Sequence, residues 1–158
     1  MQQRRLAELA AATPVTAVMT SPVVVVDAKS PVRALLRLFV AGSIGAVPVV
    51  NPRGEPVGVV SKTDVLRAIY EDPTCAGPGV AGESELEPDL PTRSSDVRAS
   101  DLMTPDPLTV PDSASVAEAA SIMAREHVHR LFVTGRAGTL AGVVSAMDLV
   151  SWLGGEPQ

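Results

Sequence analysis

The chain contains few aromatic residues and a single cysteine. Two Phe, one Tyr and one Trp are present among 158 residues, so a buried core must be built mainly from Val, Leu and Ala. A hydrophobic content of 46% still supplies enough apolar side chains for one compact domain. The lone Cys75 cannot form an internal disulfide, which favours a reducing, cytoplasmic environment.

Excess positive charge and long apolar runs are also missing. The formal net charge of −5 argues against nucleic acid or an anionic membrane surface as a general partner, although it is compatible with a local basic pocket. Residues 1–14 include two arginines but lack the continuous apolar core of an export signal. No run reaches the length of a membrane span. We therefore expect a soluble, cytoplasmic chain without a membrane segment.

What the chain does contain is an internal repeat. Residues 18–66 align with residues 102–150 without a gap, and eleven positions are identical. The identities include the Met-Thr pairs Met19-Thr20 and Met103-Thr104. They also include Gly-Val-Val-Ser-x-x-Asp, which occurs at 58–64 and again at 142–148. Two copies of one structural unit therefore lie in tandem.

Each copy predicts the same order of elements, β-α-β-β-α. A short β-rich run leads through a turn into a helix-periodic stretch, two strands follow around a Gly-bearing turn, and a second helix ends the copy. In the first copy these segments are 22–28, 30–42, 44–50, 57–60 and 61–70, with Pro31 expected in the first helical turn. In the second they are 107–113, 114–127, 128–134, 141–144 and 145–153.

The remaining segments define the predicted domain boundaries. Residues 1–13 form a short N-terminal helix, 14–72 the first repeat and 98–155 the second. Residues 73–97 are rich in Pro, Gly, Ser and acidic residues and lack an apolar period, so they are predicted to be a partly disordered linker.

Three short motifs occur in the same order in both repeats. They are the opening Met-Thr, the middle strands "GAVPVV" and "HRLFV", and the closing "GVVSxxD". In this respect the chain resembles a tandem pair of cystathionine-β-synthase (CBS) domains, known as a Bateman module. The resemblance implies an α+β (α/β) fold in which two repeats pack through their sheets as a pseudo-twofold pair. It also implies two clefts that hold adenosine-containing ligands such as AMP, ADP, ATP, NAD or S-adenosylmethionine in many relatives.

The Ser-x-x-Asp motif at the start of a helix has two interpretations. Ser61 and Ser145 are predicted N-caps, with Asp64 and Asp148 one turn along. The carboxylate can accept hydrogen bonds from two ribose hydroxyls while the helix terminus favours a phosphate. Alternatively, the four residues form two capping boxes that only satisfy backbone N–H groups. Recurrence of the motif inside a whole repeat favours the ligand-binding interpretation.

Three cationic or imidazole side chains are further candidates. His129 and Arg130 match the position where some relatives present His-Arg to a phosphate, although Arg130 could instead pair with Glu126. Lys62 is either a phosphate contact or an exposed residue at the start of its helix. His127 and His129 are two apart on a predicted strand, but no third His is available, so we expect no metal site.

The resemblance also implies a set of ligand contacts on the opening and middle segments. Thr63 and Met147 stand where many relatives carry an arginine, which argues against strong polyphosphate binding. Besides the residues already named, the expected contacts are Thr20, Val24, Ile44, Ala46, Val47, Pro48, Thr104, Leu108, Val128, Leu131 and Phe132.

The sequence therefore predicts a regulatory module and not an enzyme, since no nucleophile with an acid-base partner and no phosphate-binding loop is apparent. It would bind an adenine nucleotide or related adenosyl ligand and signal occupancy, through an effector protein that is unknown, by a conformational or assembly change. The alternative is a structural or interaction module whose clefts are vestigial. Apolar helices at 32–42, 116–127 and 148–153 favour a homodimer. If each cleft combines segments of both repeats, Lys62 and Arg130 converge on the cleft of Asp64, and phosphate-bearing ligands prefer that cleft.

Overall fold

The computed structural model describes residues 2–42, 44–70 and 97–155. The predicted linker 73–97 therefore lies outside the described residues, except for Val97. The chain divides into two compact units. The first unit contains Met1–Val24, Pro52–Pro56 and Asp106–Gln158, and the second unit contains Val25–Asn51 and Val57–Pro105.

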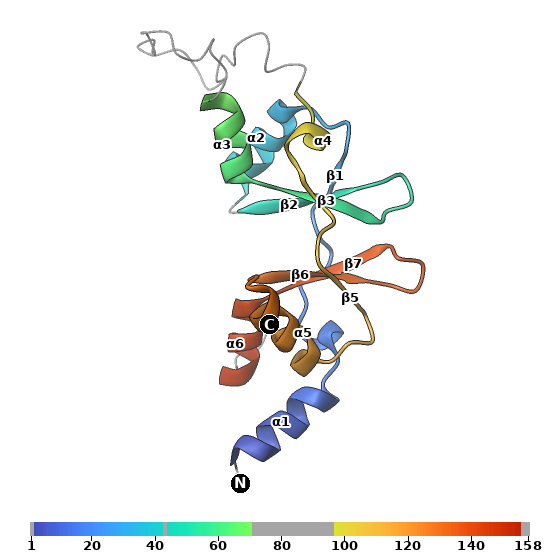
Figure 1. Cartoon of the computed structure of the whole chain (residues 1–158), viewed down its shortest axis with the longest axis vertical. Coiled ribbons are helices and arrows are strands. Elements are labelled where there is room, and N and C mark those ends of the chain that lie inside the picture. The colour runs from blue at the N-terminus through green and yellow to red at the C-terminus, as the bar shows by residue number, and fades with distance from the viewer. Residues whose placement is uncertain (1, 43, 71–96, 156–158) are drawn as a thin grey trace. The chain divides into compact units, whose positions relative to one another are not determined.

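Both repeats have the predicted β-α-β-β-α order, which confirms the α+β fold class (Figure 1). In the first repeat the elements are β1 (Val26–Asp27), α2 (Val32–Ala41), β2 (Ala46–Val50), β3 (Pro56–Ser61) and α3 (Lys62–Tyr70). In the second they are β5 (Thr109–Pro111), α5 (Val116–Glu126), β6 (Arg130–Thr134), β7 (Leu140–Ser145) and α6 (Ala146–Gly154). The additional elements are α1 (Gln2–Ala12), a 3-10 turn η1 (Val15–Ala17), α4 (Ala99–Leu102) and β4 (Thr104–Pro105).

Each unit is built around one sheet. The order in the second unit is β1-β2-β3-β4, and that in the first unit is β5-β6-β7. The first two strands of each sheet are parallel, as the intervening helix requires, and the hairpin strands β6 and β7 are antiparallel. One face of each sheet supports a core of aliphatic residues, with Leu35, Val47 and Val60 fully buried in the second unit and Leu131, Val133 and Val144 in the first.

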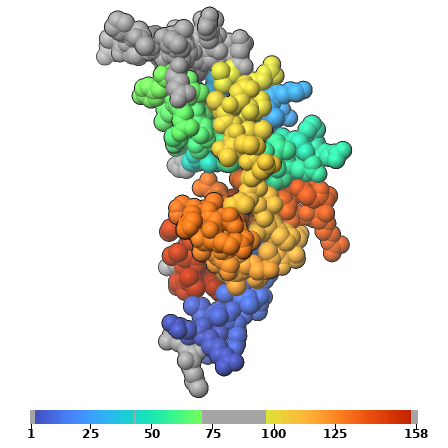
Figure 2. Space-filling view, viewed as in Figure 1, coloured from blue at the N-terminus to red at the C-terminus, as the bar shows by residue number. Residues whose placement is uncertain are grey.

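The compact units do not coincide with the sequence repeats, because the two repeats exchange their leading segments. We use this term for residues 13–20, which open the first repeat, and residues 97–105, which open the second. Segment 13–20 lies in the first unit with the strands and helices of the second repeat. Segment 97–105 lies in the second unit, where the short helix α4 contacts α3 (Figures 1 and 2).

Backbone hydrogen bonds hold each leading segment in place. In the first unit the Val15 N–H donates to the Ala114 carbonyl over 2.7 Å, and the Val116 N–H donates to the Thr13 carbonyl over 2.9 Å. Val116 is the first residue of α5, so its N–H has no partner within the helix. The leading segment therefore also caps this helix.

The second unit repeats this arrangement. The N–H of Val32, the first residue of α2, donates to the Val97 carbonyl over 2.9 Å. The Ala99 N–H donates to the Ser30 carbonyl over 2.8 Å. Pro31 is thus the N-cap of α2 and not part of its first turn, because its backbone is extended at φ −71° and ψ 151°. Each repeat therefore supplies the carbonyl that accepts the first N–H of a helix in the other repeat.

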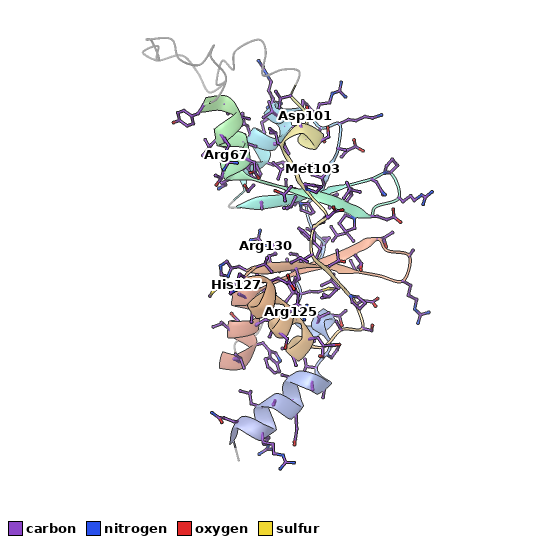
Figure 3. The ribbon with its side chains drawn as sticks, viewed as in Figure 1. Arg67, Asp101, Met103, Arg125, His127 and Arg130 are labelled. Atoms are coloured by element: carbon purple, nitrogen blue, oxygen red, sulfur yellow. The ribbon has the colours of Figure 1, made fainter. Side chains whose placement is uncertain are left out.

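The two methionines of the repeated Met-Thr pairs pack on the two glycines of Gly-Val-Val-Ser. Met103, labelled at the end of α4 in Figure 3, lies against Gly58 of β3. A Cβ built on Gly58 would lie 2.5 Å from the Met103 Sδ and 3.0 Å from its Cβ. A Cβ on Gly142 of β7 would meet the Met19 Sδ and would lie 3.0 Å from the Thr20 carbonyl oxygen. Both glycines are therefore required by packing.

Besides that of Pro31, two further expectations about local structure were wrong. His127 and His129 do not share a strand, because α5 ends at Glu126 and His127 adopts the left-handed conformation at φ 53° as its cap. Its N–H bonds to the Met123 carbonyl, and β6 begins only at Arg130. The strand expected over 22–28 is limited to Val26–Asp27, where pairing with β2 occurs. Val24 and Val25 before it are 47% and 42% exposed.

The Met–Gly contact gives a stability prediction. Gly58→Ala should destabilise the protein by about 1 to 3 kcal/mol, because the new methyl group overpacks against a methionine Cβ that no rotamer change can move. Chemical denaturation followed by circular dichroism measures this difference. Gly45→Ala is the matched control, since a Cβ there meets nothing within 4 Å. Equal midpoints for the two variants would contradict the packing argument.

Candidate functional site

Both Ser-x-x-Asp motifs form complete capping boxes. At the start of α3, the Ser61 N–H and hydroxyl donate to Asp64 Oδ2 over 2.8 and 2.6 Å, and the Asp64 N–H donates to Ser61 Oγ over 3.2 Å. At the start of α6, the Ser145 N–H and hydroxyl donate to Asp148 Oδ2 over 2.6 and 2.7 Å, and the return bond measures 3.2 Å. The hydrogen bonds expected of a capping box are therefore present in both motifs.

The capping boxes leave half of each carboxylate available. In both motifs the serine uses only Oδ2, and Oδ1 accepts no hydrogen bond from any residue in the described ranges. Both aspartates are only half-buried. The capping box thus holds a carboxylate in a fixed orientation with an unused acceptor oxygen, an arrangement that suits a hydroxyl donor from a ligand.

The expected cations lie beside the two boxes. The Lys62 side chain is exposed, and its N–H donates to the Gly45 carbonyl over 3.0 Å, so the start of α3 is joined to the chain just before β2. In the first unit the Ala146 N–H donates to the His129 carbonyl over 2.9 Å. Arg130 is the register partner of Ser145. Backbone pairing therefore places Arg130 at the strand end that carries the second box.

Arg130 does not pair with Glu126. The Glu126 carboxylate instead accepts a 2.8 Å ion-paired hydrogen bond from the neighbouring Arg125. Arg130 is exposed, with His127 nearby at the end of α5 (Figure 3). Within the described ranges neither Arg130 nor Lys62 has an ion-pair partner. Both cations can therefore meet an external anion. Their convergence on one cleft stays a prediction.

Because the leading segments are exchanged, the threonine of each Met-Thr pair lies beside the strand that precedes the capping box of the other repeat. Thr20 exchanges two backbone hydrogen bonds with Val143 of β7, of 2.8 and 3.1 Å. Thr104 is the register partner of Val59 in β3. Each exposed threonine thus lies on the strand that leads into the Ser-x-x-Asp motif of the other repeat. The sequence pattern identified both threonines but carried no signal for this reciprocal placement.

The apolar candidates differ in accessibility. Val24 and Leu108 are 47% and 40% exposed, although each precedes a strand. Ile44, Ala46 and Val128 are half-buried. The remaining four, Val47, Pro48, Leu131 and Phe132, are buried within their own units. These last four are inaccessible in their own units, whereas Val24 and Leu108 are open to solvent, and their contact with a ligand stays a prediction.

A third box, at the start of α5, provides an internal comparison. Ser115 and Glu118 form it with the same three hydrogen bonds, of 2.8, 3.0 and 3.2 Å. Hydrogen bonds from the backbone N–H and then the hydroxyl of Ser115 lower the pKa of the Glu118 carboxyl. This box is not part of any repeated motif and none of its residues is a predicted ligand contact. It therefore serves as an example of a capping box that only stabilises its helix.

Two kinds of feature are missing from the described part of the chain. No group of three His, Cys, Asp or Glu side chains there is arranged to hold a metal ion. None of the helices described is both long and apolar enough to cross a membrane.

A model of the CBS domain matches residues 15–71 and again residues 99–155. The two matches confirm the resemblance noted in the motifs and the tandem arrangement.

Curated relatives are of modest identity. One uncharacterized protein of Methanocaldococcus jannaschii is 28% identical over 141 residues, which are 89% of this chain and 32% of that protein. A second from the same organism is 26% identical over 149 residues, covering 86% of this chain and 88% of that protein. Human 5'-AMP-activated protein kinase subunit gamma-3 is 29% identical over 78% of this chain, but the match covers only 23% of that subunit. The chain thus spans about a third or less of two of these relatives and most of the other.

Solved structures agree in fold. The CBS domain of a CBS domain containing membrane protein from Sphaerobacter thermophilus has a TM-score of 0.72 at 27% identity, covering 95% of this chain and 93% of that one. CBSX2 from Arabidopsis thaliana, solved in complex with AMP, has a TM-score of 0.68 at 26% identity, covering 89% of this chain and 96% of that one.

Proposed function

Because the chain belongs to the CBS domain family and carries two copies of the domain, we propose that it is a regulatory module which binds an adenine nucleotide or a related adenosyl ligand. The ligand is held at the Ser-x-x-Asp helix starts, and its presence is signalled by a conformational or assembly change. In this proposal the chain is not itself an enzyme. AMP, ADP, ATP, NAD and S-adenosylmethionine are the ligands to test.

The observation that carries the proposal is the unused oxygen of the two box aspartates. A carboxylate oxygen accepts hydrogen bonds strongly, and one of the two ribose hydroxyls of an adenosyl group could donate to each Oδ1. The partial positive charge of the helix start favours a nearby phosphate, to which Lys62 or Arg130 adds a full charge. The complex of the related CBSX2 with AMP supports this class of ligand.

A specific observation favours the alternative function as an interaction module. On α6 the side chains of Met147, Val150 and Leu153 are 68%, 55% and 54% exposed. They are three residues apart, so they form one uncharged stripe. An exposed apolar stripe of this kind is suited to association with a second copy or another protein.

Acid-to-amide substitution tests the ligand-binding proposal. Asp64→Asn and Asp148→Asn keep a carbonyl oxygen for the capping box but replace the unused acceptor with an NH₂ donor. A hydrogen bond to a charged group contributes about 1.5 to 3 kcal/mol, so the dissociation constant for AMP should rise about tenfold or more. Isothermal titration calorimetry measures the affinity, and thermal unfolding shows whether the fold is retained.

Glu118→Gln is the matched control, because it makes the same acid-to-amide change in the third box. Its affinity for AMP should equal that of the unmodified chain. A larger loss for Asp64→Asn than for Asp148→Asn would bear out the predicted preference for the Asp64 cleft, and equal losses would refute it. If the unmodified chain releases no heat with any of the five ligands, the interaction module becomes the better description.

The phosphate contact can be tested separately. Arg130→Gln should raise the dissociation constant for AMP about tenfold and leave that for adenosine unchanged. Only AMP carries the phosphate charge with which a guanidinium would pair. Arg136→Gln, also exposed and located in the β6–β7 turn, is the control. A double-mutant cycle then combines Arg130→Gln with each aspartate variant. Coupling with Asp64→Asn would support the crossed cleft, whereas coupling with Asp148→Asn would contradict it.

Association through α6 is tested by light scattering. The unmodified chain should scatter light with the mass of a homodimer, and Val150→Lys should scatter with the mass of a monomer. The lysine charge would be buried in the dimer interface without a partner, because the α6 stripe is uncharged. Leu9→Lys on α1 is matched in exposure, at 56% against 55%, and should leave the mass unchanged. A monomer mass for the unmodified chain would count against the homodimer.

A further inference from the structure

The methionines of the described chain fall into three classes of exposure. Met147 on α6 is 68% exposed, whereas Met123 on α5 is only 6% exposed, in the core of the first unit. Met19 and Met103, which belong to the two leading segments, are half-buried. Each of these two side chains thus has a packed side and a side open to water. A small oxidant can therefore reach them while the protein is folded.

The packed side of both leading-segment methionines is tight. Met19 packs against the core of the first unit, and Met103 packs against that of the second. The sulfur of each also lies against a glycine of the adjacent strand, Gly142 for Met19 and Gly58 for Met103 (Figure 3). A Cβ added to Gly58 would come within 2.5 Å of the Met103 Sδ. There is accordingly no room for an additional oxygen atom between either sulfur and its strand.

These two side chains hold the leading segments at the point where backbone pairing joins them to the sheets. Thr20, which follows Met19, exchanges backbone hydrogen bonds of 2.8 and 3.1 Å with Val143. Thr104, which follows Met103, is the register partner of Val59. An enlarged and polar sulfur would turn toward water and pull the segment away from its strand. The cost of oxidation therefore falls on the contact between the segment and the sheet.

We propose that Met19 and Met103 are modification sites for a hydroperoxide, and that their sulfoxides loosen the leading segments. The thioether sulfur attacks one peroxide oxygen, so that an S–O bond forms as the O–O bond breaks. The sulfur loses two electrons, and the hydroxyl proton moves to the departing oxygen, which leaves as water or an alcohol. A methionine sulfoxide reductase reverses the step, because a dithiol supplies two electrons and the oxygen leaves as water. Ligand binding is not required.

Leucine substitution separates this chemistry from packing. Methionine also fills irregular gaps in a core, and leucine of similar volume keeps most of that packing but cannot form a sulfoxide. The test variant is therefore Met19→Leu with Met103→Leu. Met147→Leu is the control, since it removes the most exposed methionine of the described residues and touches neither leading segment.

Hydrogen peroxide is the probe, and two measurements follow its action on the folded full chain. Peptide mass spectrometry should find sulfoxide first at Met147, then at Met19 and Met103, and last at Met123. Amide hydrogen exchange should then accelerate about tenfold at Thr20 and Val143, because loosening of the segment breaks their mutual hydrogen bonds.

Val32 is the reporter for the second unit, because its N–H donates to Val97 in the other leading segment. Exchange there should accelerate about tenfold as well. Oxidised Met147→Leu should behave like the oxidised unmodified chain, and the double leucine variant should keep its slow exchange. Methionine sulfoxide reductases A and B with dithiothreitol should restore slow exchange in the unmodified chain.

The single variants keep the test decisive if circular dichroism shows that the double variant does not fold. Met19→Leu should protect Thr20 and Val143 from the effect of peroxide but not Val32, and Met103→Leu should do the reverse.

Any of four results would overturn the proposal. The first is a folded chain in which Met147 is fully oxidised and neither leading-segment methionine is. Another is unchanged exchange although both sulfoxides have formed. A third is acceleration that is as large in the leucine variants at every reporter, which would place the damage elsewhere. The last is fast exchange that persists after both sulfoxides have been reduced.

Discussion

The rest of the structure depends on the exchange of leading segments between the two repeats. The first N–H groups of a helix have no partner within that helix, and leaving one buried and unpaired costs about 1 to 3 kcal/mol. Here the Thr13 carbonyl accepts the N–H of Val116, and the Val97 carbonyl accepts that of Val32. The acceptor for the first N–H of α2 thus comes from the second repeat and that for α5 from the first. One repeat alone leaves the first N–H of this helix without its carbonyl partner and its sheet without the methionine that covers its glycine, so each unit needs residues from both repeats.

The same exchange explains why Gly-Val-Val-Ser-x-x-Asp occurs in both repeats. The glycines of β3 and β7 leave room for the methionines of the other repeat's leading segment. Val60 and Val144 are fully buried and fix which face of each strand meets the core. The serine and aspartate then close the capping box at the next helix. Packing thus accounts for the first half of the motif and capping for the second, and only the free carboxylate oxygen is left for a ligand.

Local regularities were predictable from the sequence, and long-range pairing was not. Helix periodicity, strand composition and the spacing of Ser61 and Asp64 depend on neighbours within one turn, so they predicted the order of elements and both boxes. The partner of Thr20 lies more than a hundred residues away, and no local pattern distinguishes β3 from β7 as that partner. His127 was misassigned because a helix that ends in a left-handed histidine lacks the usual glycine signal. Val24 and Val25 were wrongly assigned to a strand. Valine favours β structure, but a strand also needs a neighbour to pair with, and β2 pairs only with Val26 and Asp27.

Net charge alone does not distinguish the two Ser-x-x-Asp sites. The second unit carries seven basic and ten acidic residues, a formal net charge of −3, and the first unit, with six basic and eight acidic residues, carries −2. The potential of a whole surface steers charged ligands before any contact forms, so these similar totals give an anionic ligand no preference between Asp64 and Asp148. A difference in phosphate affinity between the two sites therefore has to come from local cations such as Lys62 and Arg130.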